Sequence, residues 1–309
     1  MRKFTVAAYY AGIPANNTNE EKPLILDNFC LGVMINSDRA IKHYQPTPIP
    51  ADVALIQGFV HENSKLTPHL QVRRRVIDFQ KEHEKRTLIV DSNLFLYADP
   101  GNSKRYLRYS FDGIFPKTGF YFDSNIDPSR WKKISENLNI SVKDYREKGN
   151  HVLVCLQRNG GWSMQGLDSL KWLNQTIEII KKFTDRPILV RPHPGDKQTK
   201  QTLRLNLPNV SISKQNNIKD DLIDAWATVV YNSSPSIASL IEGIPVFITD
   251  SNPENSQSFD VANLNLSNLE KPELKDRTKW LEKLSMCHWS FEELKSGEAW
   301  RFMKDYVDQ

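Results

Sequence analysis

Residues 188–197 read ILVRPHPGDK, and residues 228–235 read TVVYNSSP. In both stretches a run of strand-forming apolar residues stops abruptly at polar residues, as a buried strand does where it passes into a loop. Loops that leave the carboxyl ends of parallel strands share one crevice, so we expect the two stretches to surround the same ligand.

The polar residues of these two loops suit an anion. His193 and Lys197 supply an imidazole and an ammonium group next to Arg191, and the flanking prolines restrict the backbone so that the imidazole is held in place. Asn232, Ser233 and Ser234 open a predicted helix, where free N–H groups and the helix dipole favour a negative charge. The alternatives are a rigid turn with a solvent-facing histidine and an ordinary helix N-cap. Together the two loops predict a diphosphate site and hence a nucleotide sugar.

Two further segments extend the predicted donor site. Glu242 follows on the same helix, and a carboxylate near such a crevice accepts hydrogen bonds from both ribose hydroxyls. Residues 157–162 read QRNGGW; Arg158 there can neutralise a phosphate, and Gly160 and Gly161 let the backbone approach a ligand closely. The alternatives are a surface glutamate and a solvated loop arginine.

Strand-like and helix-like segments alternate along the whole chain, which predicts the α/β class with two Rossmann-like, doubly wound parallel sheets. We expect an acceptor-binding domain at residues 1–148 and a nucleotide-sugar-binding domain at residues 149–309. The closing segment carries Trp280, Trp289 and Trp300 on helices, which we expect to form core or to clamp the two halves together. The expected strands are residues 4–8, 51–57, 87–90, 151–156, 187–190, 209–213, 228–231 and 244–249, and the expected helices are residues 23–32, 66–85, 128–138, 167–183, 198–205, 219–226 and 236–242.

In the first half, polar residues also follow the predicted strands. Tyr10, Gly12, Gln57 and Asn93 lie at these strand ends and are the candidate acceptor-binding residues. A sugar acceptor needs a base to take its hydroxyl proton, and a carboxylate or an imidazole can serve. Asp91 is our first choice and His61 the second; the alternative is that Asp91 only caps the turn after its strand.

Composition describes a globular protein with 39% hydrophobic and 25% charged residues among 309. The apolar N-terminal run is too short for a signal peptide and no run of eighteen apolar residues exists, so we expect a cytoplasmic protein without a membrane partner. Its three cysteines are widely spaced, which argues against disulfides and structural zinc. Two basic clusters, residues 73–75 and 81–86, either face a polyanion or are solvated helix faces.

Familiar catalytic patterns do not occur. The sequence contains no P-loop, no nucleophile elbow, no zinc-protease helix and no Asp-x-Asp pair. We therefore expect no metal and no required cofactor, with protein cations holding the diphosphate of a donor that we expect to be UDP-linked.

The stretch at residues 191–194, the NSS at 232–234, EGIPV at 242–246 and the closing 289–300 stretch resemble the second domain of capsule-polysaccharide-type glycosyltransferases. This superfamily includes retaining β-Kdo transferases, and the resemblance implies the two-domain GT-B architecture. The whole chain also resembles glycosyltransferases of tailed bacteriophages, on residues 7–12, 91–93 and 286–289. That resemblance implies hydroxymethylated pyrimidines in double-stranded DNA as acceptor, and the host cytoplasm as location.

The resulting hypothesis is a nucleotide-sugar-dependent hexosyl- or pentosyltransferase that modifies bacteriophage DNA. Three alternatives stay open: a transferase acting on a capsule or lipopolysaccharide glycan, a non-catalytic nucleotide-sugar or nucleic-acid binding module, and a nucleotide-sugar epimerase.

Overall fold

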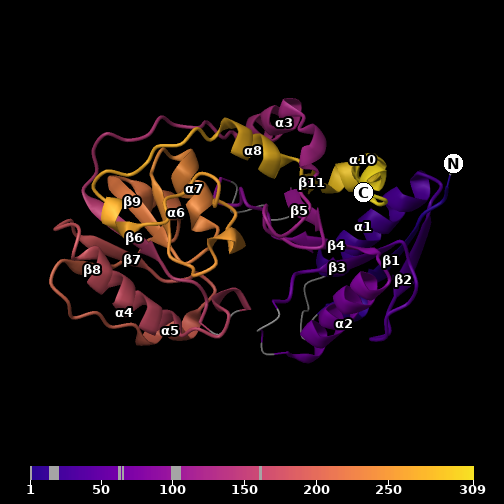
Figure 1. The fold of residues 1–309 in the computed structure, drawn as a ribbon, viewed down its shortest axis with the longest axis horizontal. Helices are drawn as coiled ribbons and strands as arrows, with labels where there is room; N and C mark the ends of the chain where they lie inside the picture. Colours follow the sequence, from indigo (N-terminus) through magenta and orange to yellow (C-terminus); the bar gives the residue numbers. More distant parts are fainter. Residues whose placement is uncertain (1, 14–20, 62–63, 65, 99–105, 160–161) are drawn as a thin grey trace. The chain divides into compact units, whose positions relative to one another are not determined.

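The computed structural model describes residues 2–13, 21–61, 64, 66–98, 106–159 and 162–309, which form two compact units (Figure 1). Unit 1 comprises Met1–Val60, Lys65–Trp131 and Glu282–Gln309, and unit 2 comprises His61–Ser64 and Lys132–Leu281. The division differs from the one expected at residue 148, because the C-terminal segment joins unit 1 rather than the second half.

Unit 1 is built on a six-stranded sheet, sheet A, with the strand order β11-β5-β4-β3-β1-β2. Four of its strands are parallel, as expected, but β5 pairs antiparallel with β4, and β11 pairs antiparallel with β5. The antiparallel edge was not predicted. The strands are β1 Thr5–Tyr9, β2 Arg39–His43, β3 Val53–Gln57, β4 Arg86–Asp91, β5 Tyr106–Phe111 and β11 His288–Ser290, and the main helices are α1 Glu21–Ile35 and α2 Pro68–Glu82. A further helix, α3 Pro128–Leu138, begins in unit 1 and continues into unit 2 after Trp131.

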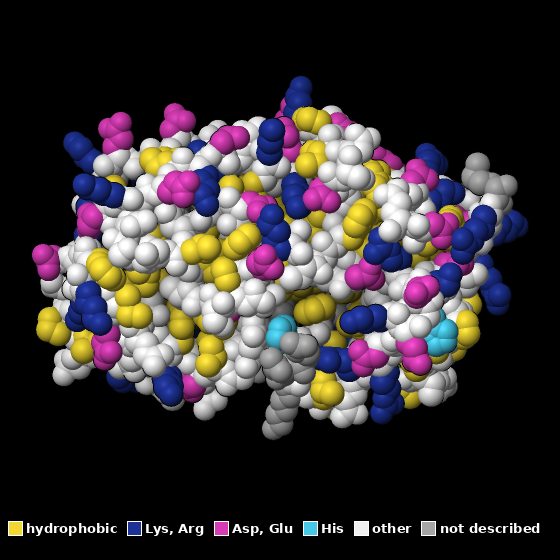
Figure 2. Space-filling model, in the orientation of Figure 1, with side chains coloured by type: hydrophobic (Ala, Val, Ile, Leu, Met, Phe, Trp, Pro, Cys, Tyr) yellow, Lys and Arg dark blue, Asp and Glu magenta, His cyan; other side chains and the backbone are white. Residues whose placement is uncertain are grey.

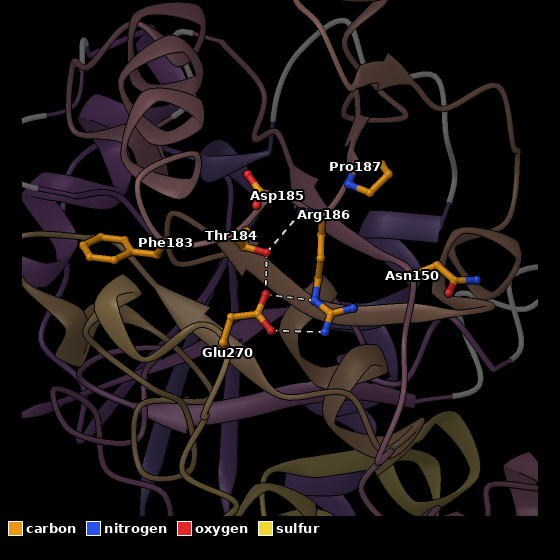
Figure 3. A pocket seen from close by; sticks show the side chains of 7 residues that line it. All are labelled: Asn150, Phe183, Thr184, Asp185, Arg186, Pro187 and Glu270. Carbon is orange, nitrogen blue, oxygen red and sulfur yellow. Dashed lines mark hydrogen bonds and ion pairs between the residues drawn. The ribbon is translucent and has the colours of Figure 1, made fainter.

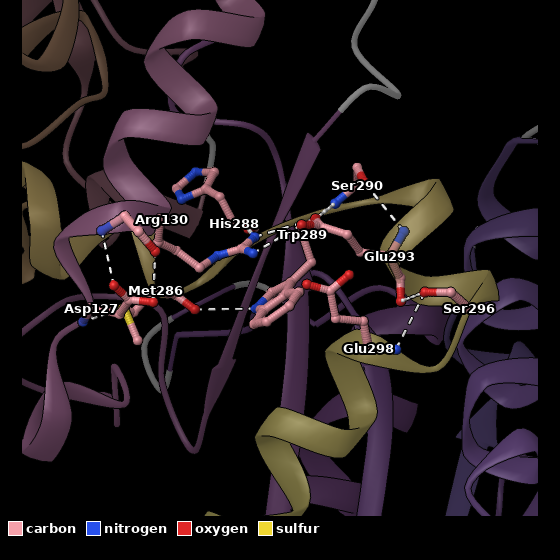
Figure 4. Close-up of polar contacts among 10 residues, drawn as sticks. Asp127, Arg130, Met286, His288, Trp289, Ser290, Glu293, Ser296 and Glu298 are labelled. Atoms are coloured by element: carbon pink, nitrogen blue, oxygen red, sulfur yellow. Dashed lines mark hydrogen bonds and ion pairs between the residues drawn. The ribbon is translucent and has the colours of Figure 1, made fainter.

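A buried ion pair anchors the C-terminal segment in unit 1 (Figure 4). Arg130, near the start of α3, donates to Glu293 in α9 (Phe291–Lys295) at 2.9 Å, and its guanidinium lies 3.7 Å from the centre of the Trp289 ring. It also donates to the carbonyl oxygen of His288. Both partners of the ion pair are buried, so losing either one would leave an uncompensated charge.

The last helix, α10 (Glu298–Met303), contributes to the same core. The Trp300 indole packs edge-on against Phe29 in α1 and donates to Asp38 at 2.8 Å. Trp289 and Trp300 are therefore core residues of unit 1. Trp280 belongs to unit 2, where its indole donates to the Gln257 carbonyl oxygen at 2.8 Å. It lies on α8 (Thr278–Ser285), the helix along which the chain returns to unit 1.

Unit 2 carries a five-stranded, fully parallel sheet, sheet B, with the order β10-β9-β6-β7-β8. Its helices cover both faces, α4 and α5 on one side and α6 and α7 on the other (Figure 1). The structure confirms the predicted α/β class. The strands are β6 His151–Cys155, β7 Ile188–Arg191, β8 Val210–Ile212, β9 Ala225–Val230 and β10 Val246–Ile248, and the helices are α4 Ser169–Ile180, α5 Lys197–Thr202, α6 Ile218–Leu222 and α7 Pro235–Ile241.

Several elements of unit 2 are shorter than expected, and one of them shows why. The helix expected at residues 219–226 ends at Leu222, and β9 already begins at Ala225. Asp224 between them has a left-handed backbone with φ of 58°, a conformation that single Asp and Asn residues tolerate and that interrupts a helix. The polar spacing alone did not reveal this break.

A buried histidine in unit 1 should make stability depend on pH. The Nδ1 of His288 donates to the Leu284 carbonyl oxygen at 2.8 Å, its Nε2 accepts from the Leu94 amide at 3.3 Å, and burial lowers its pKa to about 3. In the unfolded chain its pKa returns to about 6.5, so only the unfolded state takes up the proton between these values. The free energy of unfolding should therefore fall by about 1.4 kcal/mol per pH unit as the pH drops from about 6.5 towards 3.

Urea unfolding followed by tryptophan fluorescence between pH 3.5 and 7.5 measures this effect. Other titrating groups contribute equally to the wild type and to His288→Gln, so the difference between the two isolates the histidine. Parallel pH profiles for the two proteins would contradict the assignment.

Candidate functional site

The order of sheet B defines a point at which its connections diverge. From the central strand β6 the chain passes through α4 to β7 on one side, whereas β9 lies on the other side of β6. In open α/β sheets the ligand crevice forms outside the carboxyl ends of the two strands at this point. The segments at these strand ends contain several of the predicted donor-binding residues, namely Arg158, Arg191, His193, Lys197, Asn232, Ser233 and Ser234.

The loop after β6 is tied to the loop after β9. The Gln157 side chain accepts from the Asn232 amide at 3.2 Å, and the Asn232 side chain donates to Asp250, which follows β10, at 2.6 Å. Gln157 also donates to the Ser163 hydroxyl at 2.8 Å. Asn232, a predicted donor-binding residue, is buried and holds these loops together.

The loop after β6 is also tied to the loop after β7. Asp196, the N-cap of α5, accepts from the amides of Asn159 and Thr199, each at 2.9 Å. Burial of Asp196 opposes its ionisation, but these hydrogen bonds outweigh it and lower the pKa of the carboxyl. Sequence reasoning did not assign Asp196 a role; the available signal was an aspartate directly before a helix, with a threonine three residues later.

The hydrogen bond of His193 fits a neutral imidazole, whereas the sequence analysis considers a cationic one. The His193 Nδ1 accepts from the Gly195 amide at 3.0 Å, which leaves the proton on Nε2. Burial, and then the positive charge of Arg158, lower its pKa below the usual value. Arg158 is exposed, so the two side chains offer one cation and one N–H at the same place. Gly160 and Gly161 lie outside the described residues.

At the start of α7, one of the two predicted serines has a free hydroxyl. The Ser233 Oγ is buried and has no partner among the described residues. Ser234 is exposed and its side chain does not cap the helix. The carbonyl oxygen of Ser233 accepts from the Ser236 hydroxyl at 2.9 Å. Ser233 is therefore the hydroxyl of this loop with unused hydrogen-bonding capacity.

Arg191, a predicted phosphate ligand, makes structural contacts. It forms a buried ion pair with Asp221 and donates to the carbonyl oxygens of Gln215 at 3.2 Å and Asn216 at 2.9 Å. These bonds hold the loop after β8 against the end of β7.

Glu242, the predicted ribose ligand, lies at the far end of α7 from Ser234. It is the C-cap residue of this helix and is ion-paired with Lys143. Seven residues of helix span about 10 Å, so the start of α7 lies at the carboxyl edge of sheet B and Glu242 at the opposite edge. Lys197, the first residue of α5, is exposed.

In unit 1, two predicted acceptor-side residues already have partners. The Tyr10 hydroxyl donates to Asp27 at 2.5 Å, and its ring stacks on Tyr44 with centroids 4.7 Å apart. The Gly12 carbonyl oxygen accepts from the Arg73 side chain at 3.0 Å. Gln57 and Asn93, by contrast, each keep one buried side-chain atom, Oε1 and Nδ2, without a partner among the described residues.

The two candidate bases belong to different units. Asp91 ends β4 in unit 1, where its carboxylate lies 3.4 Å from the buried guanidinium of Arg108, the residue opposite it on β5. His61 is half-buried in the short segment grouped with unit 2. The sequence leaves open that Asp91 only caps the turn after its strand. In the structure Asp91 accepts from the Ser92 amide and also neutralises the buried Arg108.

A surface hollow occurs at the opposite edge of sheet B (Figure 3). Its lining includes Asn150 and Pro187, which directly precede β6 and β7. Two of its charged residues are paired with each other, because the Arg186 guanidinium donates to the two Glu270 oxygens at 3.0 and 3.1 Å. We assign no chemistry to this hollow.

Among the described residues, no group of three or more His, Cys, Asp and Glu side chains is arranged to hold a metal ion. The three cysteines are buried and unpaired, and burial raises the pKa of Cys155 to about 12. Within the same part of the chain, no helix has the length and apolar character needed to span a membrane.

The comparisons with known proteins agree with this architecture. Two solved structures from Thermosulfurimonas dismutans are similar over nearly the whole chain, the KpsC beta Kdo 2,4 transferase and the KpsC beta Kdo 2,7 transferase. The first has a TM-score of 0.56 at 13% identity, with 93% of this chain and 91% of that chain covered. The second has a TM-score of 0.52 at 12% identity, with 96% and 98% covered. No protein-family model and no curated protein sequence matches the chain.

These similarities show the fold, which is that of the GT-B glycosyltransferases. The expected resemblance to capsule-type β-Kdo transferases is confirmed at the level of fold. The resemblance to bacteriophage enzymes stays a prediction, because nothing in these comparisons bears on it.

Asp196 offers a test of the predicted donor site. Asp196→Ala removes the acceptor that joins two loops and caps α5, so it should lower the free energy of unfolding by about 1–2 kcal/mol and weaken nucleotide binding. The matched control is Asn217→Ala, which removes the N-cap of α6 by deleting a bond from the Lys219 amide at 3.0 Å. The control should lose about 1 kcal/mol of stability while keeping its affinity for UDP in calorimetric titrations. Equal affinities in both variants would show that the tied loops do not form a nucleotide site.

Proposed function

We propose that the protein is a nucleotide-sugar-dependent glycosyltransferase whose donor diphosphate binds at the carboxyl edge of sheet B. The observation that carries the proposal is the joining of three loops at the ends of β6, β7 and β9. These loops present the cation of Arg158, the Nε2–H of His193 and the free hydroxyl of Ser233.

This combination suits a departing nucleoside diphosphate. As the sugar leaves, negative charge grows on the phosphate oxygens, and fixed donors stabilise it without reorganising. A neutral imidazole held by the Gly195 amide is such a donor, and an exposed arginine supplies a bidentate cation. We therefore propose that protein groups hold the diphosphate, with UDP as the expected nucleotide.

For the acceptor we propose a hydroxyl of a surface glycan, as in the capsule-type alternative. The two similar structures are beta Kdo transferases. The basic clusters, which favoured DNA in the sequence analysis, do not form uniformly exposed basic surfaces. Of residues 73–75, Arg73 is buried and Arg74 is half-buried, and in 81–86 Glu82 and Glu84 accompany the cations. On the face drawn in Figure 2, Lys and Arg are interspersed with Asp and Glu.

For the base we keep Asp91, which ends a strand of unit 1 beside a buried cation. A carboxylate so placed can take the proton of the attacking hydroxyl as the anomeric carbon gains positive character. His61 remains the second candidate.

Replacing His193 should weaken catalysis more than folding. His193→Ala removes one hydrogen bond to a charged group, worth about 1.5–3 kcal/mol, so turnover should fall by about tenfold to a hundredfold with little change in unfolding temperature. Steady-state rates measure the effect, and His83→Ala, at an exposed histidine of α2's end, is the control. A wild-type rate in His193→Ala would remove this residue from the mechanism.

The lowered pKa of His193 also gives a pH signature. A bound diphosphate favours the protonated imidazole and so raises this pKa. UDP affinity should therefore increase as the pH falls from 7.5 to 5.5, since ligand binding takes up a proton. Calorimetric titration of the wild type and of His193→Gln measures the increase, which the variant should lack; titration of UDP itself affects both proteins equally.

The reaction itself is tested with a panel of uridine, cytidine and guanosine diphosphate or monophosphate sugars. Release of free sugar and nucleotide without acceptor supports a transferase and contradicts a non-catalytic module, whereas an epimerised donor would reveal an epimerase. Mass spectrometry of added oligosaccharides and of nucleosides from hydroxymethylcytosine DNA then identifies the acceptor. Labelled nucleosides with unmodified glycans would overturn the glycan proposal.

A further inference from the structure

A buried arginine in unit 1 has no counter-ion in the part of the chain that the structure describes. Arg73 lies in the middle of α2 with 8% of its surface exposed, and its Nε donates to the Gly12 carbonyl oxygen at 3.0 Å. Among the described residues, no carboxylate forms an ion pair with it. The negative charge of Asp91 favours the charged form of the Arg73 guanidinium, but Asp91 forms its ion pair with Arg108.

The backbone around this guanidinium leaves room for it. Gly58, directly after β3, has a left-handed φ of +86°, and a Cβ there would lie 2.6 Å from the Arg73 Nη1. At Gly12, after β1, a Cβ would lie 3.5 Å from the Arg73 Cγ. The guanidinium therefore rests on the ends of two adjacent parallel strands, at the edge of sheet A where ligands of α/β sheets bind.

Keeping this charge buried is unfavourable for the protein alone. Burial lowers the pKa of the guanidinium to about 10, and the charge of Asp91 offsets this only in part. Buried charges in proteins are normally paired. An unpaired one at a ligand-binding edge is therefore a candidate for an anion that arrives from outside.

Two other side chains at the same edge have unused hydrogen-bonding groups. The Gln57 Oε1 and the Asn93 Nδ2 are buried without partners among the described residues, and Asn93 is 6% exposed. Gln57 ends β3 and Asn93 lies two residues beyond β4. The edge thus offers a cation, an acceptor and a donor, which complement an anionic group and hydroxyls.

We propose that Arg73 binds the anionic group, a carboxylate or a phosphate, of an acidic saccharide acceptor, with Gln57 and Asn93 bonding to its hydroxyls. The saccharide part rests on the proposed function, whereas anion binding at Arg73 does not. A recessed single guanidinium fits one terminal acidic group better than a polyanion, which needs several exposed cations.

The experiment compares three small probes: glucuronic acid, glucose 6-phosphate and neutral glucose. Titrations with the wild type should show binding of at least one acidic probe and far weaker binding of glucose. Arg73→Gln should lower that affinity at least tenfold, and Arg73→Lys, which keeps the charge but loses the planar fork, at least threefold. The control is Arg75→Gln, an exposed arginine on the same helix, which should bind as the wild type does. The acidic probe that binds more tightly distinguishes carboxylate from phosphate.

A second measurement does not require that the Arg73→Gln variant folds. The Nε–H resonance of Arg73, assigned from its absence in Arg73→Lys, should shift when the acidic probe is added to the wild type and should not shift with glucose. An unmoved resonance, unchanged affinity in Arg73→Lys, or Arg73-dependent binding of duplex DNA without binding of either acidic probe would each overturn the proposal.

The glycosyltransferase proposal and the anion site at Arg73 can fail independently of each other. Donor hydrolysis by the wild type without acceptor tests the former, and titration with the acidic probes tests the latter. Arg73-dependent binding of the acidic probes supports the anion site whether or not donor hydrolysis is detected.

Discussion

The parallel pairing of β6 with β7 on one side and β9 on the other is the constraint on which unit 2 depends. Because all three strands point the same way, their following loops must meet at one edge. The buried polar groups of these loops then have to satisfy one another, which Asp196 and Asn232 do by bridging neighbouring loops. The groups left over, on His193 and Ser233, are those that can meet a ligand.

Much of this framework was predictable from the chain, because buried parallel strands have a strong local pattern. The runs before Arg191 and Asn232 are apolar and end at turn residues, and Gly243 has the positive φ of 78° expected after a helix. Strands β5 and β11 were not predicted, because they lack such a local pattern. Residues 106–111 include a buried arginine and a buried serine, which interrupt the apolar pattern, and β11 pairs with a strand far back along the chain.

The candidate site was predictable in its location and less so in its roles. Sequence shows that a residue is charged but not which partner it has: Arg191 proved to be neutralised by Asp221 and Glu242 by Lys143. Arg73 shows the reverse case, since it is part of a basic cluster in the sequence but is buried, with no counter-ion among the residues that the structure describes. The residues that surround a charge in three dimensions decide whether it stabilises the fold or is available to bind a ligand.

The return of the chain to unit 1 bears on how the protein is made. Sheet A lacks its final strand, and the core lacks Trp289 and Trp300, until residues 282–309 have been synthesised. Unit 2 is complete in sequence by Leu281, so during translation it can close around its own core while unit 1 still exposes the edge of β5. A chain whose synthesis stops before residue 288 would therefore have a folded unit 2 and a unit 1 whose sheet lacks its edge strand. Chaperones and proteases act on such exposed strand edges.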